Sequence, residues 1–203
     1  MKKDLQQISE YIKENFSANN ITIAPIQNDN LIIYIDKNNI ITFLTFLKTD
    51  QNLSFKILID LFGADLLGMR TPRFEVIYNL LSLKLNQRIT IKIAAEDKIS
   101  IPTISSIHST ANWFEREIFD MYGIIFENHP DLRRILTDYE FEGYPLRKDF
   151  PLTGYKEVRY DEVEKKVIYE PVKLQQEYRN FDFENPWQGT QYKLPGDEKV
   201  KKN

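Results

Sequence analysis

The sequence predicts an α+β fold, a two-layer sandwich in which helices pack on a mixed five-stranded sheet. Segments with an apolar residue every three or four positions, typical of amphipathic helices, alternate with short segments rich in β-branched residues, typical of strands. Their order is helix, two strands, helix, three strands and helix, which favours helices on one face of the sheet. The chain has 203 residues, enough to bury one ordinary core.

The first part of the chain is predicted to supply two helices and a hairpin. Apolar residues at helical spacing predict an amphipathic helix over residues 2–16. Residues 21–24 and 31–35 are rich in β-branched side chains and flank a polar turn, which predicts a β-hairpin. Asn38 or Asn39 is expected to cap a short second helix. The buried side of that helix is predicted to carry Ile40, Phe43, Leu44 and Leu47.

Three more strands are predicted over residues 55–62, 74–83 and 88–94. A tight turn at Asn86-Gln87 is expected between the last two strands, whereas residues 63–72 contain Gly and Pro and indicate a longer loop. The sequence contains no internal repeat and no glycine-rich phosphate-binding loop, so it does not predict nucleotide binding of the usual kind.

A last helix is predicted from Trp113 to Tyr122. Ser109 or Asn112 is a suitable cap, and Glu115, three residues after Asn112, would complete a capping box. Gly123 stands where a helix ends with a residue in the left-handed conformation. The helix is therefore expected to stop at Gly123.

Beyond Pro151 the helical and strand periodicities stop, so we predict an α+β domain over residues 1–150 and an extended tail over residues 151–203. Disordered segments are poor in aromatic residues, but this tail is rich in them. We expect these rings to anchor the tail on a neighbouring protein, although wrapping around its own domain is an alternative. The aromatic residues are Tyr155, Tyr160, Tyr169, Tyr178, Phe181, Phe183, Trp187 and Tyr192.

The composition excludes several functional classes. The formal net charge is −3, so no global positive field favours nucleic acid or anionic lipid. The chain has no cysteine, which removes thiolate chemistry and cysteine-ligated iron–sulfur or zinc sites. No stretch approaches the ~20 apolar residues of a spanning helix, and the N-terminus matches neither a secretory signal nor a transit peptide. If the protein takes part in redox chemistry, another chain must hold the redox centres.

The candidate catalytic and metal-binding residues are few. Glu115 and Glu117 point to different sides of the predicted helix, so joint acid–base catalysis is not favoured. Arg116 and Asp120 are one turn apart and are expected to pair. The two histidines, His108 and His129, lack the further ligands of a metal site, and His129 is expected to bond loop backbone. No serine stands in a nucleophile elbow, so hydrolase chemistry has no support either.

The pairs Arg133-Arg134 and Arg147-Lys148 form a second dense feature. Arginines bind phosphate well, but acidic residues alternate with these cations, so charge pairs are favoured over nucleic-acid binding. We expect Arg133 and Arg134 to bond carboxylates of a neighbouring subunit or of the tail. From the residues alone, the sequence indicates an interaction protein.

The dense run has a defined pattern: Glu-Arg-Glu, then Asp, an aromatic residue, Gly, His-Pro and a paired arginine followed by two aliphatic residues. This run resembles the signature of the C subunit of respiratory complex I, the proton-pumping NADH:quinone oxidoreductase. The likeness continues to Tyr155, and the stretch after it is similar to the branch that uses ubiquinone. One departure is Tyr144, where His is expected. The signature positions are Glu115, Arg116, Glu117, Asp120, Met121, Tyr122, Gly123, Phe126, His129, Pro130, Arg133, Arg134, Ile135 and Leu136.

The resemblance implies a structural subunit of the peripheral arm, with no cofactor on this chain. FMN and iron–sulfur clusters would lie in partner subunits, and the chain would contact the large quinone-site subunit and the adjacent cluster-bearing subunits. It would sit on the cytoplasmic side of a bacterial inner membrane, or the matrix side of the mitochondrial one, with membrane contact only through the complex. The alternative is the corresponding subunit of a membrane-bound hydrogenase or another quinone-linked complex.

The resemblance also implies which residues form the subunit interface. They comprise the polar and turn residues of the signature, the later basic pair and two aromatic residues of the tail. These are Glu115, Arg116, Glu117, Asp120, Tyr122, Gly123, His129, Pro130, Arg133, Arg134, Arg147, Lys148, Tyr155 and Trp187.

Overall fold

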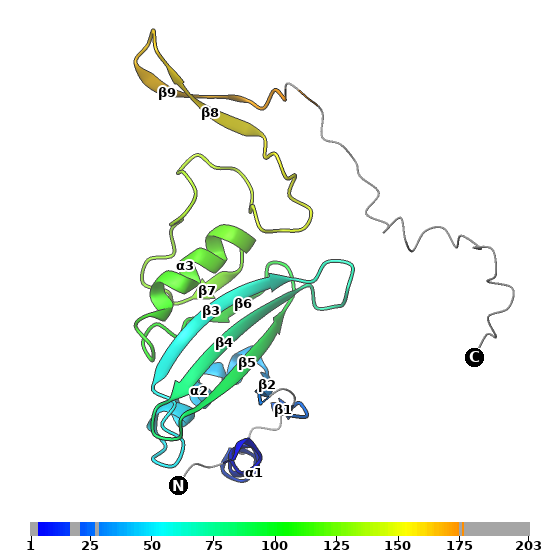
Figure 1. Cartoon of the computed structure of the whole chain (residues 1–203), viewed down its shortest axis with the longest axis vertical. Helices are drawn as coiled ribbons and strands as arrows, with labels where there is room; N and C mark the ends of the chain where they lie inside the picture. Colours follow the sequence, from blue (N-terminus) through cyan, green and yellow to red (C-terminus); the bar gives the residue numbers. More distant parts are fainter. Residues whose placement is uncertain (1–3, 17–20, 27–28, 175, 177–203) are drawn as a thin grey trace, which may run out of the picture. The chain divides into compact units, whose positions relative to one another are not determined.

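A computed structural model of the chain describes residues 4–16, 21–26, 29–174 and 176, which fall into two units that meet between Gly154 and Tyr155. The first unit contains a five-stranded sheet with the strand order β1-β2-β5-β4-β3 (Figure 1). The sheet is mixed, because β2 runs parallel to β5 while the other neighbours are antiparallel. The strands are β1 (Ile21–Ile23), β2 (Leu31–Ile35), β3 (Ile57–Asp65), β4 (Phe74–Ser82) and β5 (Gln87–Ala95).

Three helices, α1 (Leu5–Asn15), α2 (Ile40–Thr49) and α3 (Ala111–Tyr122), bury their apolar sides in one core with the sheet. The four apolar residues expected to face inward from α2 are all fully buried. Asn39, one of the two expected caps, stands at the N-cap of α2, but its side chain makes no cap bond. A 3₁₀ turn, η1 (Lys37–Asn39), precedes the helix, and Asp36 caps that turn. The fold class predicted from the sequence is confirmed.

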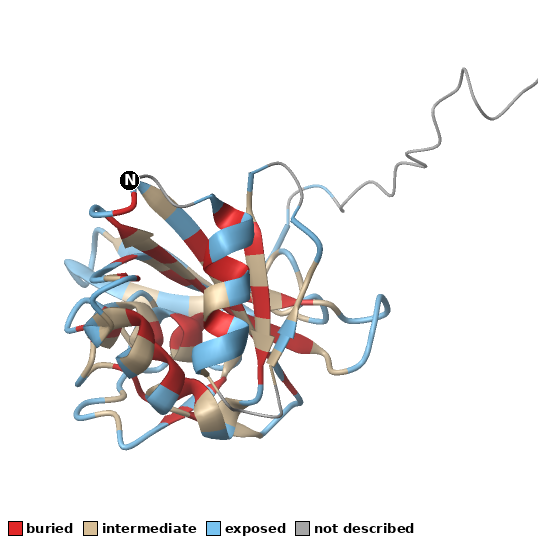
Figure 2. Ribbon diagram, turned by 90° about the horizontal axis from the view of Figure 1, so that it is seen from below, coloured by how far each residue is buried: buried red, intermediate tan, exposed pale blue. Residues whose placement is uncertain are grey.

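One face of the sheet carries the core. Alternate residues of β5, namely Ile89, Ile91 and Ile93, are fully buried, and the buried residues gather between helices and sheet (Figure 2). A Cβ atom at Gly63 of β3 would lie 2.9 Å from the ring of Tyr122. A glycine is therefore needed where α3 approaches the edge strand so closely.

A short parallel pair, β6 (Ser100–Pro102) with β7 (Ile125–Glu127), joins the segments that precede and follow α3. The N–H of Thr103 donates to the carbonyl of Glu127 at 2.9 Å and extends the pair. Three-residue strands are too short to show an alternating pattern, so the sequence did not indicate them. The pair brings the polar residues on both sides of α3 together.

The second unit contains a β-hairpin that the sequence prediction missed, formed by β8 (Lys156–Asp161) and β9 (Lys166–Pro171). Val158 faces Tyr169 and Tyr160 faces Val167 across the two strands. Charged residues dilute the apolar alternation, which explains why the region showed no clear period. The expected anchors from Tyr178 onwards, Trp187 among them, lie outside the described residues. The boundary after residue 150 and the subunit-binding role of residues 151–203 stay predictions.

Candidate functional site

Asp120 of α3 anchors the loop that follows the helix. Its carboxylate, buried at the helix end, accepts the N–H groups of Ile135, Leu136 and Thr137 at 2.7–3.0 Å and the hydroxyl of Thr137. Burial acts to raise the pKa of this carboxyl, but the bonds from Thr137, Leu136 and Arg134 outweigh it and lower the pKa to about 2. Asp120 is therefore ionised at neutral pH and its oxygens are occupied.

Arg134 supplies the countercharge. Its guanidinium donates to the Asp120 carboxylate at 2.8 Å and to the carbonyl of Gly143 at 3.0 Å, and it lies over the rings of Phe141 and Tyr144. The partner of Arg134 is thus within its own unit, which corrects the expectation that it bonds a neighbouring subunit or the tail. The expected pairing of Asp120 with Arg116 was also wrong.

Arg116 has a different task on α3. Its guanidinium donates to the carbonyls of Arg133 and Arg134, both at 3.1 Å. The loop backbone bends back over α3 and brings its carbonyls within reach, which helical spacing alone does not reveal. Arg116 therefore binds carbonyl groups of the loop, whereas Asp120 binds N–H groups of the same loop.

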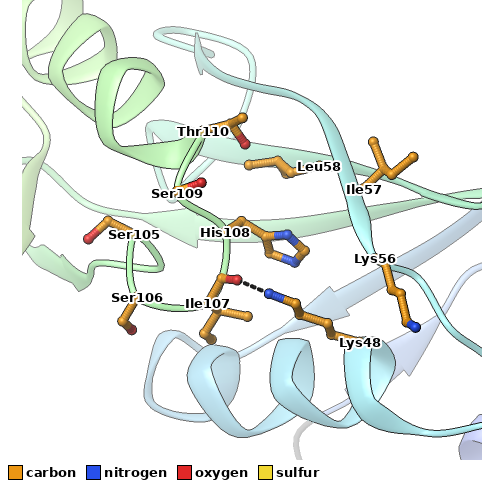
Figure 3. Close-up of a pocket in the computed structure, with 10 residues that line it drawn as sticks. All are labelled: Lys48, Lys56, Ile57, Leu58, Ser105, Ser106, Ile107, His108, Ser109 and Thr110. Carbon is orange, nitrogen blue, oxygen red and sulfur yellow. Dashed lines mark hydrogen bonds between the residues drawn. The ribbon is translucent and has the colours of Figure 1, made fainter.

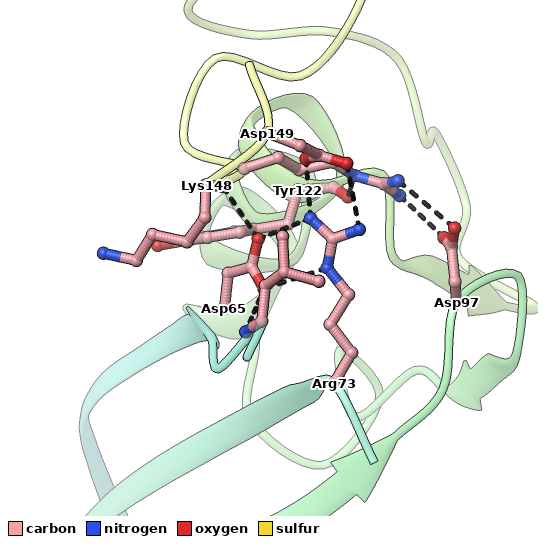
Figure 4. Close-up of polar contacts among 8 residues, drawn as sticks. Asp65, Arg73, Asp97, Tyr122, Lys148 and Asp149 are labelled. Carbon is pink, nitrogen blue, oxygen red and sulfur yellow. Dashed lines mark hydrogen bonds and ion pairs between the residues drawn. The ribbon is translucent and has the colours of Figure 1, made fainter. Parts of the chain in front are cut away.

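A second buried carboxylate, Asp65 at the end of β3, binds the far end of the loop (Figure 4). Arg73 donates to both oxygens of Asp65, at 2.9 and 2.7 Å, and to Asp149, at 2.6 and 3.2 Å. The N–H of Lys148 donates to Asp65 at 2.8 Å. Burial of Asp65 is outweighed by these bonds and by the N–H of Leu67, so its pKa falls to about 2.

Arg147 completes this second contact. It donates to the Tyr122 carbonyl at 2.6 Å and to Asp97 at 2.9 Å, and its guanidinium lies 4.8 Å from the centroid of the Tyr144 ring. Gly123, with φ +75°, ends α3 as predicted. A Cβ there would lie 2.6 Å from Tyr144, so the close packing requires glycine.

Glu115 is the third buried carboxylate. It accepts the Ile104 N–H at 2.8 Å and the Thr103 hydroxyl, and its Oε2 lies 3.7 Å from Nε2 of His129. Burial raises the pKa of Glu115 to about 7, although the two hydrogen bonds oppose the rise. The predicted capping box was wrong, because Thr103 and Ile104 take this side chain and the cap residue Thr110 makes no side-chain cap bond.

His129 bonds loop backbone, as predicted. Its Nε2 lies 3.0 Å from the Asn112 carbonyl, and Nδ1 accepts the Asp131 N–H at 3.0 Å. This pair of bonds places the ring proton on Nε2, an assignment made from the hydrogen-bond partners. The side chain is fully buried, so His129 fixes the turn after β7 beneath the start of α3.

The remaining expected interface residues lie at the surface. Glu117 and Pro130 are exposed, and Arg133 pairs with Asp131 at 2.9 Å while 64% of its side chain stays accessible. Lys148 joins the network through its backbone, and Tyr155 is exposed at the start of the second unit. The signature thus divides into internal bonds, which fix the loop, and a few exposed side chains.

Two of the three buried carboxylates of this region act as hydrogen-bond acceptors. Asp65 and Asp120 are ionised and saturated with donors, so neither has a proton to give at neutral pH. Within the described ranges, no group of three or more His, Asp or Glu side chains is placed to hold a metal ion. What the arrangement does is fix residues 124–150 on α3 and on the ends of β3 and β5.

The sequence pattern did not indicate Asp65, Asp97 or Thr103 as parts of this region. Asp65 lies 83 positions from Lys148 and Asp97 lies 50 positions from Arg147, whereas Thr103 is 12 positions from Glu115. None of the three belongs to a motif. The sequence offered one sign: Asp65 and Asp97 are acidic residues that each follow the end of a predicted strand by a few positions.

Comparison with known proteins agrees with this picture. Residues 33–156 match the family model described as respiratory-chain NADH dehydrogenase, 30 Kd subunit. A protein of Mesorhizobium japonicum, named as the C subunit of NADH-quinone oxidoreductase, is 51% identical over 203 residues, which is 100% of both chains. A protein of the same name from Hyphomonas neptunium is 57% identical over 171 residues, 84% of each chain.

Two solved structures share the fold. One, described as Nqo5 of a trypsin-resistant fragment, is 27% identical with a TM-score of 0.55, and the match covers 64% of this chain and 100% of the other. The second is a chain of the membrane-bound sulfane sulfur reductase, an archaeal respiratory membrane complex. It is 25% identical with a TM-score of 0.61, covering 74% of this chain and 87% of that one.

Proposed function

The chain belongs to the family of the 30-kDa subunit of respiratory-chain NADH dehydrogenase, and from that premise we propose that it is a structural subunit of the peripheral arm of complex I. In this role it would hold neighbouring subunits in place while they pass electrons from NADH to quinone. FMN and iron–sulfur clusters are assigned to the partners, because this chain lacks cysteine ligands for clusters and a glycine-rich loop for the phosphate of FMN.

One observation carries the proposal: the loop fixed by Asp120 and Asp65 turns large apolar side chains outward. Tyr139 is 91% exposed, Leu136 and Leu146 are also exposed, and Leu152, just beyond the loop, is 84% exposed. A loop held by buried charge pairs is rigid, so presenting these residues costs little conformational entropy on binding. Large exposed apolar residues on an ordered loop mark a protein interface.

The hairpin of the second unit supports the same role. Val158, Tyr160 and Val167 stand on one side of β8 and β9 and are all exposed. A two-stranded hairpin is marginal in water without further packing. A face of this composition is suited to packing against a partner, in line with the aromatic residues of the following segment.

The partners follow from the family. We assign the contacts to the large quinone-site subunit and to the adjacent cluster-bearing subunits. None of the helices in the described part of the chain is long and apolar enough to cross a membrane. We propose peripheral attachment on the cytoplasmic side of the inner membrane, through the complex. A hydrogenase subunit is not retained as an alternative, because the full-length relatives carry the name NADH-quinone oxidoreductase.

Affinity purification of the tagged full-length chain from detergent-solubilised membranes tests the proposal. The expected result is recovery together with flavin-bearing and iron–sulfur-bearing subunits in constant proportion. A variant with Leu83→Asp, which alters an exposed leucine in the turn between β4 and β5, serves as a control and should be recovered with the same partners. Recovery of the chain alone, with no other subunit, would contradict the proposal.

A further inference from the structure

A pocket of about 480 Å³ lies away from the fixed loop, between the end of α2, the start of β3 and the segment that leads into α3 (Figure 3). Its lining includes two lysines, Lys48 and Lys56, and no aspartate or glutamate. The chain as a whole has a net charge of −3, whereas the lining of this pocket carries a local excess of positive charge. Such a pocket attracts anions.

His108 provides an independent sign of a ligand. Only 5% of this residue is exposed, and it lines the pocket, yet among the described residues its Nε2 has no hydrogen-bond partner. In Figure 3 the imidazole points from its loop toward β3, between Lys48 and Leu58. A buried ring nitrogen without a partner is costly, because it has lost its water. A ligand oxygen in the pocket would satisfy it.

The charge state of His108 fits a donor to an anion. Burial, with a smaller effect of Lys48, lowers the pKa of His108 to about 4, so the ring is neutral at pH 7. A neutral imidazole with its proton on Nε2 donates one hydrogen bond without bringing another positive charge next to the lysines. The pocket therefore contains charged hydrogen-bond donors, the ammonium groups of Lys48 and Lys56, and a neutral donor, the His108 ring.

Further donors line the mouth of the pocket. Lys48 uses one N–H for the Ile107 carbonyl, which holds its ammonium group beside the pocket and leaves its other protons available. Ser106, Ser109 and Thr110 are exposed there, and within the described ranges their hydroxyls make no hydrogen bond to protein groups. The first N–H groups of α3 already bond the carbonyls of His108 and Ser109, so the helix contributes its dipole but not these donors.

We propose that this pocket binds a phosphate group, with Lys48 and Lys56 as charge partners and His108 as an inner hydrogen-bond donor. Phosphate fits better than carboxylate, because it offers more acceptor oxygens to the lysines and hydroxyls and lysine binds phosphate as a point charge without an arginine fork. The group could be free phosphate, a soluble phosphomonoester or a lipid headgroup, since all three present the same chemistry.

Side-chain NMR of the full chain labelled with ¹⁵N-histidine tests the proposal, because the sequence has two histidines and the other, His129, lies outside the pocket. Inorganic phosphate at constant ionic strength should shift the His108 ring signals saturably and leave those of His129 in place. Glycerol 3-phosphate and phosphatidylcholine vesicles with or without phosphatidic acid form further arms. A response to soluble phosphates supports a free ligand, and a response to phosphatidic acid vesicles alone supports a lipid headgroup.

Lysine variants separate binding from a general effect of salt. Lys56→Met alters an exposed residue, so the fold should persist, and it should weaken phosphate binding about tenfold. Lys13→Met, on the exposed side of α1, is the matched control and should bind as the parent does. The proposal is overturned if no phosphate arm shifts the His108 signals, if acetate shifts them as strongly as phosphate, or if Lys56→Met binds unchanged.

Discussion

The guanidinium of Arg134 lies 2.8 Å from the carboxylate of Asp120, a buried residue at the end of α3. The same carboxylate accepts three consecutive backbone N–H groups of the loop. A residue of the helix thus determines the path of the chain beyond it. The polar density of the signature is explained by this internal framework, which leaves apolar residues facing outward.

Replacing Asp120 with asparagine should destabilise the first unit by about 2 to 3 kcal/mol, because a neutral amide cannot accept all of these donors and Arg134 loses its countercharge. Urea unfolding of the full chain measures the effect. The pKa of Asp120 is lowered, so its contribution is present above the ordinary value of 3.8 and fades as pH falls toward 2. The difference between parent and variant should shrink over that interval.

The matched control for this variant is Asp131→Asn. Asp131 pairs with Arg133 at the surface, and such exposed pairs contribute about 0 to 1 kcal/mol. If Asp120→Asn proved no more costly than Asp131→Asn, the loop would not depend on Asp120 as described.

Arg73→Lys should cost about 2 kcal/mol, because an ammonium group cannot make paired bonds to Asp65 and Asp149 at once. The fully buried Asp65 side chain would then lose part of its compensation. Urea unfolding again measures the loss, with Arg133→Lys, at an exposed pair, as the control. Equal stabilities for the two variants would show that the second contact of the loop contributes little.

Gly123→Ala and Gly68→Ala separate two costs of substituting a glycine. Both residues have positive φ, +75° and +78°, but a Cβ at Gly123 meets Tyr144 at 2.6 Å while one at Gly68 meets nothing within 4 Å. Gly68→Ala should lower the free energy of unfolding by about 1 kcal/mol, the cost of positive φ alone. Gly123→Ala should lower it by at least about 1 kcal/mol more, because its Cβ also clashes with Tyr144. Similar thermal unfolding shifts for both would contradict the close packing at the end of α3.

Glu115→Gln should change how stability depends on pH. The pKa of Glu115 is raised to about 7 in the folded chain from an ordinary 4.5. Its contribution to the free energy of unfolding is therefore most favourable below pH 4.5 and is lost as the pH rises to 7. Between pH 4.5 and pH 7, the free energy of unfolding of the variant should therefore rise by up to about 3 kcal/mol relative to that of the parent. Denaturant unfolding at several pH values measures the difference, and a constant difference would rule out a raised pKa.

For His108→Gln, the stability difference between variant and parent should change with pH in the opposite direction. The pKa of His108 is lowered from 6.5 to about 4, so its favourable effect is present above 6.5 and is lost as pH falls to 4. The variant should gain stability relative to the parent as the solution becomes more acidic. The two variants together distinguish these buried groups from the general charge of the chain.

The sequence predicted the larger elements well, because long periodic segments carry their own signal. The four inward positions of α2 and the stop at Gly123 are where the pattern placed them. The short pair β6–β7 was missed because three residues cannot show a period. The hairpin β8–β9 was missed because its alternation is carried by Val158, Tyr160, Val167 and Tyr169 among many charges.

The site was predicted less completely, since its bonds join residues that are distant in sequence. Arg116 and Asp120 are spaced for a helical pair, yet each binds the returning loop instead. Asp65 lies 83 positions from Lys148, whose N–H it accepts, and no local pattern connects them. Local spacing indicates which residues are able to pair, but tertiary structure decides which partner is closer.

We propose that the buried charges hold a loop whose exposed apolar residues dock on partner subunits. The most direct test is the amount of assembled complex in membranes of cells that carry the double variant Leu136→Asp, Tyr139→Asp, measured by native gel and by the flavin and iron–sulfur subunits retained. Assembly should fall about tenfold or more, while the isolated chain unfolds at the same denaturant concentration as the parent and Leu83→Asp assembles normally. Normal assembly of the double variant would contradict the claim.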